Sequence, residues 1–488
     1  MMFEGEALLK YFNSKKIIKV CNALLLLVVL LSSGFYGCSK RLEIEKSDES
    51  GSNFKCFNVN ARIECMSIER TADFGFIYSG IDKSIPGNAQ GFLMKVDSAG
   101  KQEWYRTYGG ANNDGFEHAI QTSDGGYLAV GSTNSMGIGL VFAFEQSGYI
   151  VKVNSSGILE WEKDDSWRDS NGGGATSSQL NHCAEAKDHS FVVAGFYHYA
   201  SNQSNPTVAI IDPSDGSRII RDHFYASLLI NYYPFIDRGG WWDMYSDVSI
   251  SDDNNIILSG EMSSWAGVPG SSLKVPILAK LSMSSLAPAF YQKYNFADFR
   301  LRNNQNYLTY IGGQLSLLNF NLSYTRKYAP HKVLNLSDGG YLMGSFITPD
   351  NNNAAESLKF YMSLVKTDDF GDYQWSKEYK GLGTAMLWDI QQTKEGNTLL
   401  IGSSSTENFT DNSRQGFTNS KIAILTVDKD GNLLKELFIG GDQSVCIAKS
   451  LHQLSDGGYL IAGISYDPKG DRNKMFYVHV NQDGAIVK

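Results

Sequence analysis

One hexapeptide occurs three times in this chain and constrains its fold more than any other feature. The segment SDGGYL begins at Ser123, at Ser337 and at Ser455. Weaker copies of the same turn begin at Asp73, Asp188, Asp253 and Glu395. The seven copies follow one another at intervals of about 64 residues, and self-similarity at such a period indicates repeated supersecondary units.

A second turn follows the first in most units. KVDSAG begins at Lys95 and leads to Trp104, and KVNSSG begins at Lys152 and leads to Trp161. Asp or Asn followed by Gly provides the side-chain hydrogen bond and the positive φ of a tight hairpin. Each unit therefore contains four short strands. Strands a and b flank the first turn, and strands c and d flank the second.

Seven units of four strands predict an all-β chain that forms a seven-bladed β-propeller, with a solenoid as the alternative. The 48 Gly, the 12% aromatic residues and the 19% charged residues fit a protein rich in strands and turns. The blades are expected to begin near residues 61, 116, 180, 245, 331, 386 and 447. We expect 485–487 to be strand d of the last blade. Residues 54–59 should add to the outer edge of that blade and close the ring, which removes an open sheet edge.

The first 37 residues have the pattern of a lipoprotein signal peptide. Lysines precede an unbroken apolar run at 23–31, which is shorter than the roughly 20 residues that span a bilayer. Cys38 follows a glycine and is the predicted lipidation site, although Phe35 and Tyr36 depart from the usual lipobox. The alternative is an ordinary secretory signal. Residues 38–53 are polar and predict a flexible tether to the propeller domain at 54–488.

The DGGY and VDxxG-W units resemble a family of exported bacterial β-propeller repeat proteins, common as lipoproteins of the Bacteroidetes. The resemblance covers residues 60–488. It implies a propeller in the cell envelope, as an outer-membrane lipoprotein on the periplasmic side or the cell surface. It implies no shared catalytic motif.

Strand order predicts two unlike faces. All a–b and c–d turns lie on one face, and all b–c loops and d–a crossings lie on the other. The second set varies most in length, and variable loops on a rigid scaffold are where ligands usually bind.

Two neighbouring positions in the seven a strands differ sharply in polarity. One position is always apolar and predicts packing between blades: Ile68, Ala119, Cys183, Val248, Val333, Ile390 and Leu451. The preceding position is always polar: Ser67, His118, His182, Asp247, Lys332, Asp389 and Ser450. Because strand a lies nearest the axis, these polar residues predict a ring around a central funnel. They either line a water-filled channel or form a ligand or metal site that uses His118, His182, Asp247 and Asp389.

A second candidate site is aromatic. The segment before blade four holds Tyr232, Tyr233, Phe235, Trp241 and Trp242. Exposed aromatic side chains stack on sugars or anchor protein partners, whereas buried ones would form a local core. The extra length at 290–327 predicts an added hairpin in blade four.

These features favour a membrane-tethered binding or scaffold module for glycan or protein ligands. The first alternative is an enzyme that acts on a carbohydrate or small molecule with a His/Asp site. The second is a structural subunit of an envelope complex. No motif assigns a catalytic residue, a cofactor or a metal. The net charge of −9 without a basic run argues against nucleic acid as a partner.

Overall fold

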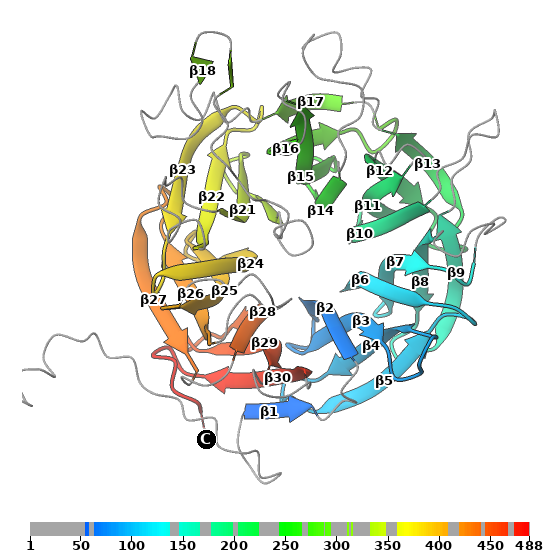
Figure 1. The fold of residues 1–488 in the computed structure, drawn as a ribbon, viewed down its shortest axis with the longest axis horizontal. Coiled ribbons are helices and arrows are strands. Elements are labelled where there is room, and N and C mark those ends of the chain that lie inside the picture. The colour runs from blue at the N-terminus through cyan, green and yellow to red at the C-terminus, as the bar shows by residue number, and fades with distance from the viewer. Residues whose placement is uncertain are drawn as a thin grey trace, which may run out of the picture. The chain divides into compact units, whose positions relative to one another are not determined.

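Seven four-stranded antiparallel sheets are arranged around a central axis (Figure 1). The computed structural model describes residues 54–57, 63–136, 146–165, 177–198, 204–223, 244–265, 272–286, 288–293, 310–311, 314–315, 332–347, 359–407, 419–440, 445–466 and 473–487. All of them belong to one compact unit, 42–488. The predicted all-β, seven-bladed propeller of four-stranded blades is confirmed.

Each of the first six blades consists of four consecutive strands. Blades one to three are β2 (Ile63–Arg70), β3 (Phe76–Asp82), β4 (Gln90–Val96), β5 (Gln102–Tyr108); β6 (Asp114–Gln121), β7 (Tyr127–Thr133), β8 (Ser147–Val153), β9 (Leu159–Asp165); β10 (Ser177–Glu185), β11 (Phe191–His198), β12 (Ser204–Ile211) and β13 (Arg218–His223). Blades four to six are β14 (Met244–Ile250), β15 (Ile256–Trp265), β16 (Ser272–Leu281), β17 (Pro288–Lys293); β20 (Lys332–Asn335), β21 (Tyr341–Ile347), β22 (Tyr361–Thr367), β23 (Tyr373–Tyr379); β24 (Thr384–Gln392), β25 (Thr398–Ser405), β26 (Lys421–Val427) and β27 (Leu433–Ile439). The first strand of each blade lies innermost (Figure 1).

Blade seven combines the two ends of the propeller. It contains β28 (Val445–Gln453), β29 (Tyr459–Tyr466), β30 (Asn473–Val480) and, at its outer edge, β1 (Phe54–Phe57). The predicted closure by the N-terminal segment is confirmed, with Phe57 opposite Met475 in the β1–β30 ladder. The expectation that 485–487 is strand d was wrong, because this segment forms only an isolated bridge between Val480 and Ile486.

Aromatic packing explains why β1 takes the outer position. Phe57 is buried, and its ring lies 5.7 Å from that of Tyr78 in an edge-on arrangement. The Tyr78 hydroxyl in turn donates to the Phe476 carbonyl oxygen at 2.8 Å. The segment at the beginning of the propeller therefore joins the cores of the first and last blades.

The apolar residues of the a strands pack as predicted. All seven are at most 4% exposed, and they contribute to hydrophobic clusters that run between blades. Cys183 is 1% exposed, as expected of a small core residue. The four cysteines among the described residues, Cys56, Cys65, Cys183 and Cys446, all have free thiols.

A β-bulge interrupts strand a in six blades, where the structure describes the whole strand. In blade two, Phe116 pairs with Gly131 and His118 pairs with Val130, so that Glu117 is an extra residue. The bulge brings strand a so close that a Cβ on Gly131 would lie 2.0 Å from the Gly115 carbonyl oxygen. This close approach explains the glycine that recurs near the end of strand b.

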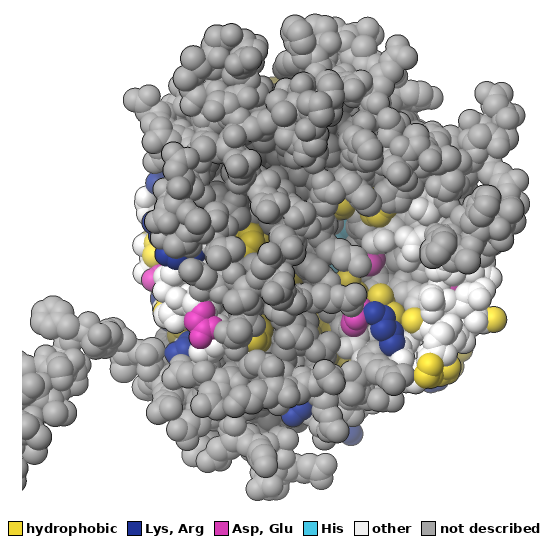
Figure 2. Space-filling view, viewed as in Figure 1, with side chains coloured by type: hydrophobic (Ala, Val, Ile, Leu, Met, Phe, Trp, Pro, Cys, Tyr) yellow, Lys and Arg dark blue, Asp and Glu magenta, His cyan; other side chains and the backbone are white. Residues whose placement is uncertain are grey.

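The insertion in blade four includes a short added hairpin, as predicted. Its described part is β18 (Tyr310–Ile311) paired with β19 (Gln314–Leu315). Among the described residues, no helix is long and apolar enough to cross a membrane. On the face that Figure 2 shows, the visible acidic and basic side chains of the described residues are interspersed in small groups.

Candidate functional site

The seven predicted polar residues, called the ring residues below, lie on the innermost strands. In the six blades with a described bulge, each ring residue follows the extra residue directly. His118, Asp247 and Ser450 are 2%, 4% and 0% exposed. The interpretation of these three as the lining of a water-filled channel was therefore wrong. Five of the ring residues bond to other blades, whereas the buried Ser450 Oγ has no hydrogen-bond partner among the described residues.

Four ring residues accept a hydrogen bond from the backbone of the following blade. The N–H groups of Ala119, Cys183, Val248 and Val333 donate to Ser67 Oγ at 3.3 Å, His118 Nδ1 at 3.4 Å, His182 Nδ1 at 3.5 Å and Asp247 Oδ2 at 2.7 Å. The series ends at Lys332, because an ammonium group has no acceptor. In blade six, Asp389 Oδ1 accepts from its own neighbour, Ile390 N–H, at 2.8 Å. The ring thus links blades one to five.

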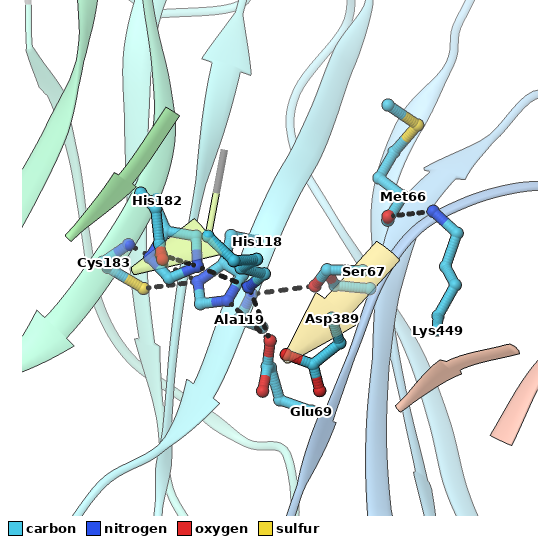
Figure 3. A network of polar contacts seen from close by, with 12 residues as sticks. Met66, Ser67, Glu69, His118, Ala119, His182, Cys183, Asp389 and Lys449 are labelled. Carbon is cyan, nitrogen blue, oxygen red and sulfur yellow. Dashed lines mark hydrogen bonds and ion pairs between the residues drawn. The ribbon is translucent and has the colours of Figure 1, made fainter. Parts of the chain in front are cut away.

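A second set of contacts crosses the axis. Lys332 extends from blade five, and its Nζ lies 3.4 Å from Glu69 Oε1 in blade one and 3.1 Å from His182 Nε2 in blade three. Glu69 also contacts His118 Nε2 at 3.1 Å (Figure 3). Glu69 was not predicted from the sequence as a site residue. It lies two residues beyond Ser67 on the same side of the strand, but most equivalent positions in the other blades are not charged.

The two ring histidines stack against each other, with ring centroids 3.4 Å apart. Because the Cys183 N–H points at His118 Nδ1, that atom is the acceptor, and Nε2 carries the proton and donates to Glu69. His182 Nε2 lies between two charged groups, 2.9 Å from Asp247 Oδ1 and 3.1 Å from the Lys332 ammonium. Both nitrogens of each ring are therefore engaged in contacts between blades.

Opposite charges stabilise the cluster around Lys332. Burial alone would lower the pKa of Lys332, but the carboxylates of Glu69, Asp247 and Asp389 raise it above its ordinary value. Burial opposes ionisation of Glu69, yet Lys332 and His118 hold its pKa well below the usual range. Burial and the nearby His182 lower the pKa of His118 to about 3, so this imidazole is neutral at physiological pH.

Asp389 behaves differently from the other two acids. Burial raises its pKa to about 6, Lys332 opposes the rise, and the charge of Glu69 adds to it. Its Oδ2 accepts from Gln391 Nε2 at 2.8 Å. The structure thus brings His118, His182 and Asp247 together, whereas Asp389 accepts hydrogen bonds from Ile390 and Gln391 within its own blade.

Three residues of the cluster have the chemistry of metal ligands. One ligand atom from each of Glu69, His118 and His182 lies within 4.8 Å of the other two. The Lys332 ammonium contacts Glu69 and His182, so the cluster already contains a cation. We therefore treat it as a charged plug between blades rather than as a metal centre.

The extra residues at the bulges form a second tier, which the sequence analysis did not predict. They lie one residue before the ring and are called the bulge residues: Met66, Glu117, Asn181, Ser246, Trp388 and Lys449. All six are partly exposed, whereas the residues immediately before them are buried. The recurrent glycine of strand b was the signal that would have revealed this tier.

Two groups of predicted site residues lie outside the described residues. They are the lipidation site Cys38 and the aromatic candidates Tyr232, Tyr233, Phe235, Trp241 and Trp242. Their roles remain predictions.

Comparisons with known proteins found distant structural matches. The Neurospora crassa Pan2 WD40 domain matches with 8% identity and a TM-score of 0.43, over 85% of this chain and 89% of that one. A PL25 ulvan lyase matches with 10% identity and a TM-score of 0.47, over 86% and 93%. A puromycin hydrolase mutant matches with 10% identity and a TM-score of 0.45, over 90% and 56%. No family model and no curated protein sequence matches the chain.

Proposed function

We propose that this protein is a membrane-tethered binding scaffold that recognises a glycan or protein ligand on the face of its b–c loops and d–a crossings. The lipid at Cys38, the location in the outer membrane and membership of the Bacteroidetes repeat family are parts of this proposal. The observation that supports it is the difference between the two faces of the propeller.

The face of the a–b turns is uniform. Every a–b connection has five residues, from 71–75 in blade one to 454–458 in blade seven. Aspartates in these turns accept from backbone N–H groups two residues later, as at Gly126, where the distance is 2.8 Å. Largely buried lysines pair with the same aspartates, as Lys152 does with Asp124 at 2.8 Å. Groups that bond within a turn in this way have little capacity left for a ligand.

The opposite face contains the variation in length. The b–c connection has seven residues in blade one, at 83–89, and 15 residues in blade six, at 406–420. Long connections of unequal length on a repeated scaffold are the usual place for recognition. A binding role also agrees with the ring, since both nitrogens of His118 and His182 contact neighbouring blades, which disfavours either as a general base.

Binding is tested by a glycan array and an envelope-protein pull-down with the soluble fragment that begins at residue 54. Trp241→Ala and Trp242→Ala are the matched variants for the aromatic segment. Specific retention of a glycan or of a stoichiometric protein supports the proposal. Turnover of a carbohydrate or small molecule that is lost in a His118→Gln variant of unchanged stability would favour the enzyme alternative.

The tether is tested separately. The full chain and a Cys38→Ser variant are expressed in a bacterium that is fed an alkyne-bearing fatty acid. Labelling of the wild type alone, together with its recovery in the membrane fraction, is expected. Equal labelling of both proteins would exclude Cys38 as the lipidation site.

A further inference from the structure

The bulge positions differ from blade to blade. Counting back from the a–b turns gives seven different residues: Met66, Glu117, Asn181, Ser246, His331, Trp388 and Lys449. His331 lies outside the described residues. The next position is polar in every blade, and the one after it is apolar in every blade. A bulge residue is left out of the ladder, so the fold places little demand on its side chain.

The bulge residues are also placed where a ligand would meet them. They belong to the innermost strands and are partly exposed between mostly buried neighbours. They precede the ring residues in strand a, so they lie closer to the d–a crossings. A ligand held on the variable face therefore approaches this tier before it reaches the ring.

Lys449 is the charged centre of this tier. Its Nζ donates to the Met66 carbonyl oxygen at 2.6 Å (Figure 3). The same atom lies 4.5 Å from the centre of the Trp388 ring. In the described part of the chain, no carboxylate oxygen forms an ion pair with it. Burial lowers the pKa of Lys449, while nearby Cys65 and Glu117 act in the opposite direction and Lys332 adds to the lowering. The ammonium is thus desolvated without a direct counter-ion.

Other bulge residues carry groups that bind hydroxyls. The indole Nε1 of Trp388 is buried and has no hydrogen-bond partner among the described residues. Asn181 donates through Nδ2 to the Tyr245 carbonyl oxygen at 2.8 Å, which presents its amide from a fixed position. Glu117, in blade two, carries a carboxylate whose charge acts on Lys449. Donors, an acceptor, an aromatic ring and a cation within one tier match the groups of a sugar that bears a carboxylate.

On the basis of the proposed binding function, we infer that the bulge tier is a subsite for an acidic sugar, whose carboxylate pairs with Lys449 and whose hydroxyls bond to Trp388 Nε1, Asn181 and Glu117. An acidic peptide is the competing ligand. It would satisfy Lys449, but it offers few hydroxyls to the remaining groups.

The test measures binding to the full chain by calorimetry. The probes are trigalacturonate, the neutral trigalactose of the same linkage, and a Glu-rich peptide. Lys449→Gln removes the charge and retains a donor for the Met66 carbonyl, whereas Lys449→Arg retains the charge. Trp388→Phe retains the ring and removes Nε1–H. Lys101→Gln, at an exposed c–d turn, is the matched control. Thermal unfolding of every variant establishes that it is folded.

Binding of trigalacturonate at least tenfold tighter than that of trigalactose is expected. Lys449→Gln should weaken it at least tenfold, Trp388→Phe about threefold, and Lys101→Gln not at all. Lys449→Arg should bind more tightly than Lys449→Gln. Equal binding of the neutral sugar, or tighter binding of the peptide, would overturn the inference. If a ligand is retained on the variable face but is insensitive to Lys449, the subsite fails and the binding scaffold stands. If neither arrays nor pull-downs retain any ligand, the proposed function fails as well.

Discussion

Two lysines lie near the axis of the ring on strands of the same kind, and their surroundings are opposite. Lys332 is a ring residue that contacts Glu69 and is influenced by Asp247 and Asp389, so its charge is more than balanced. Lys449 is a bulge residue that contacts a backbone carbonyl and an indole face. A difference of one residue in register thus separates a lysine that holds the fold together from one whose charge is left for a ligand.

The largest effect is expected from Lys332→Met. Removal of the ammonium leaves the partly exposed Glu69 without its main counter-charge and the buried Asp247 without a nearby cation, which costs about 3–5 kcal/mol in such settings. Urea unfolding at pH 7.5 measures the loss. The pKa values of Glu69 and Asp247 are lowered in the folded wild type, so their contribution is present above the unfolded values and is lost as the pH falls. The deficit of Lys332→Met should therefore shrink in acid.

Lys101→Met is the control for that measurement, because Lys101 is exposed in a c–d turn. We expect no change in its unfolding midpoint. A Lys332→Met protein as stable as the wild type would refute the role of Lys332 as the charge that holds the plug together.

The next largest loss of stability is expected from a change at the bulge, which separates the ring residues from the bulge residues. Gly131→Ala places a Cβ 2.0 Å from the Gly115 carbonyl oxygen, so the bulged strand must shift, at a cost of about 3 kcal/mol. Gly396→Ala has open space but a φ of 82°, and it should cost only about 1 kcal/mol. Equal losses in the two variants, measured by thermal unfolding, would show that the bulge does not require the glycine.

The bulge and its recurrent glycine also separate what could be predicted from the sequence from what could not. The turn copies were enough to predict seven blades, the closure by 54–59 and the polar and apolar positions of strand a. The bulge was not predicted, because strict alternation does not allow for an extra residue. The contact between Lys332 and Glu69 across the axis was not predicted either, because it depends on the width of the closed propeller. Glu69 itself follows no repeat, since Ile120, Ala184 and Leu334 occupy the equivalent positions.

A smaller effect of opposite sign is expected from Asp389→Asn. The pKa of Asp389 is about 6 in the folded protein, above its ordinary value of 3.8, so its ionisation costs stability as the pH rises through this interval. The amide keeps an oxygen for Ile390 N–H and carries no charge. A gain of about 1–2 kcal/mol is therefore expected at pH 8 and none at pH 3.5. Urea unfolding at both values tests the sign, and a loss at pH 8 would contradict it.

Apart from the Lys101→Met control, the smallest change in the free energy of unfolding is expected from Lys449→Met. The substitution removes one hydrogen bond to Met66 and the contact with Trp388, each worth about 1 kcal/mol. It also removes a desolvated charge that has no direct counter-ion, so the two contributions oppose each other. We expect the unfolding free energy to change by less than about 1 kcal/mol, in contrast to Lys332→Met. A loss as large as that of Lys332→Met would mean that Lys449 holds the fold together, and the division between the two tiers would fail.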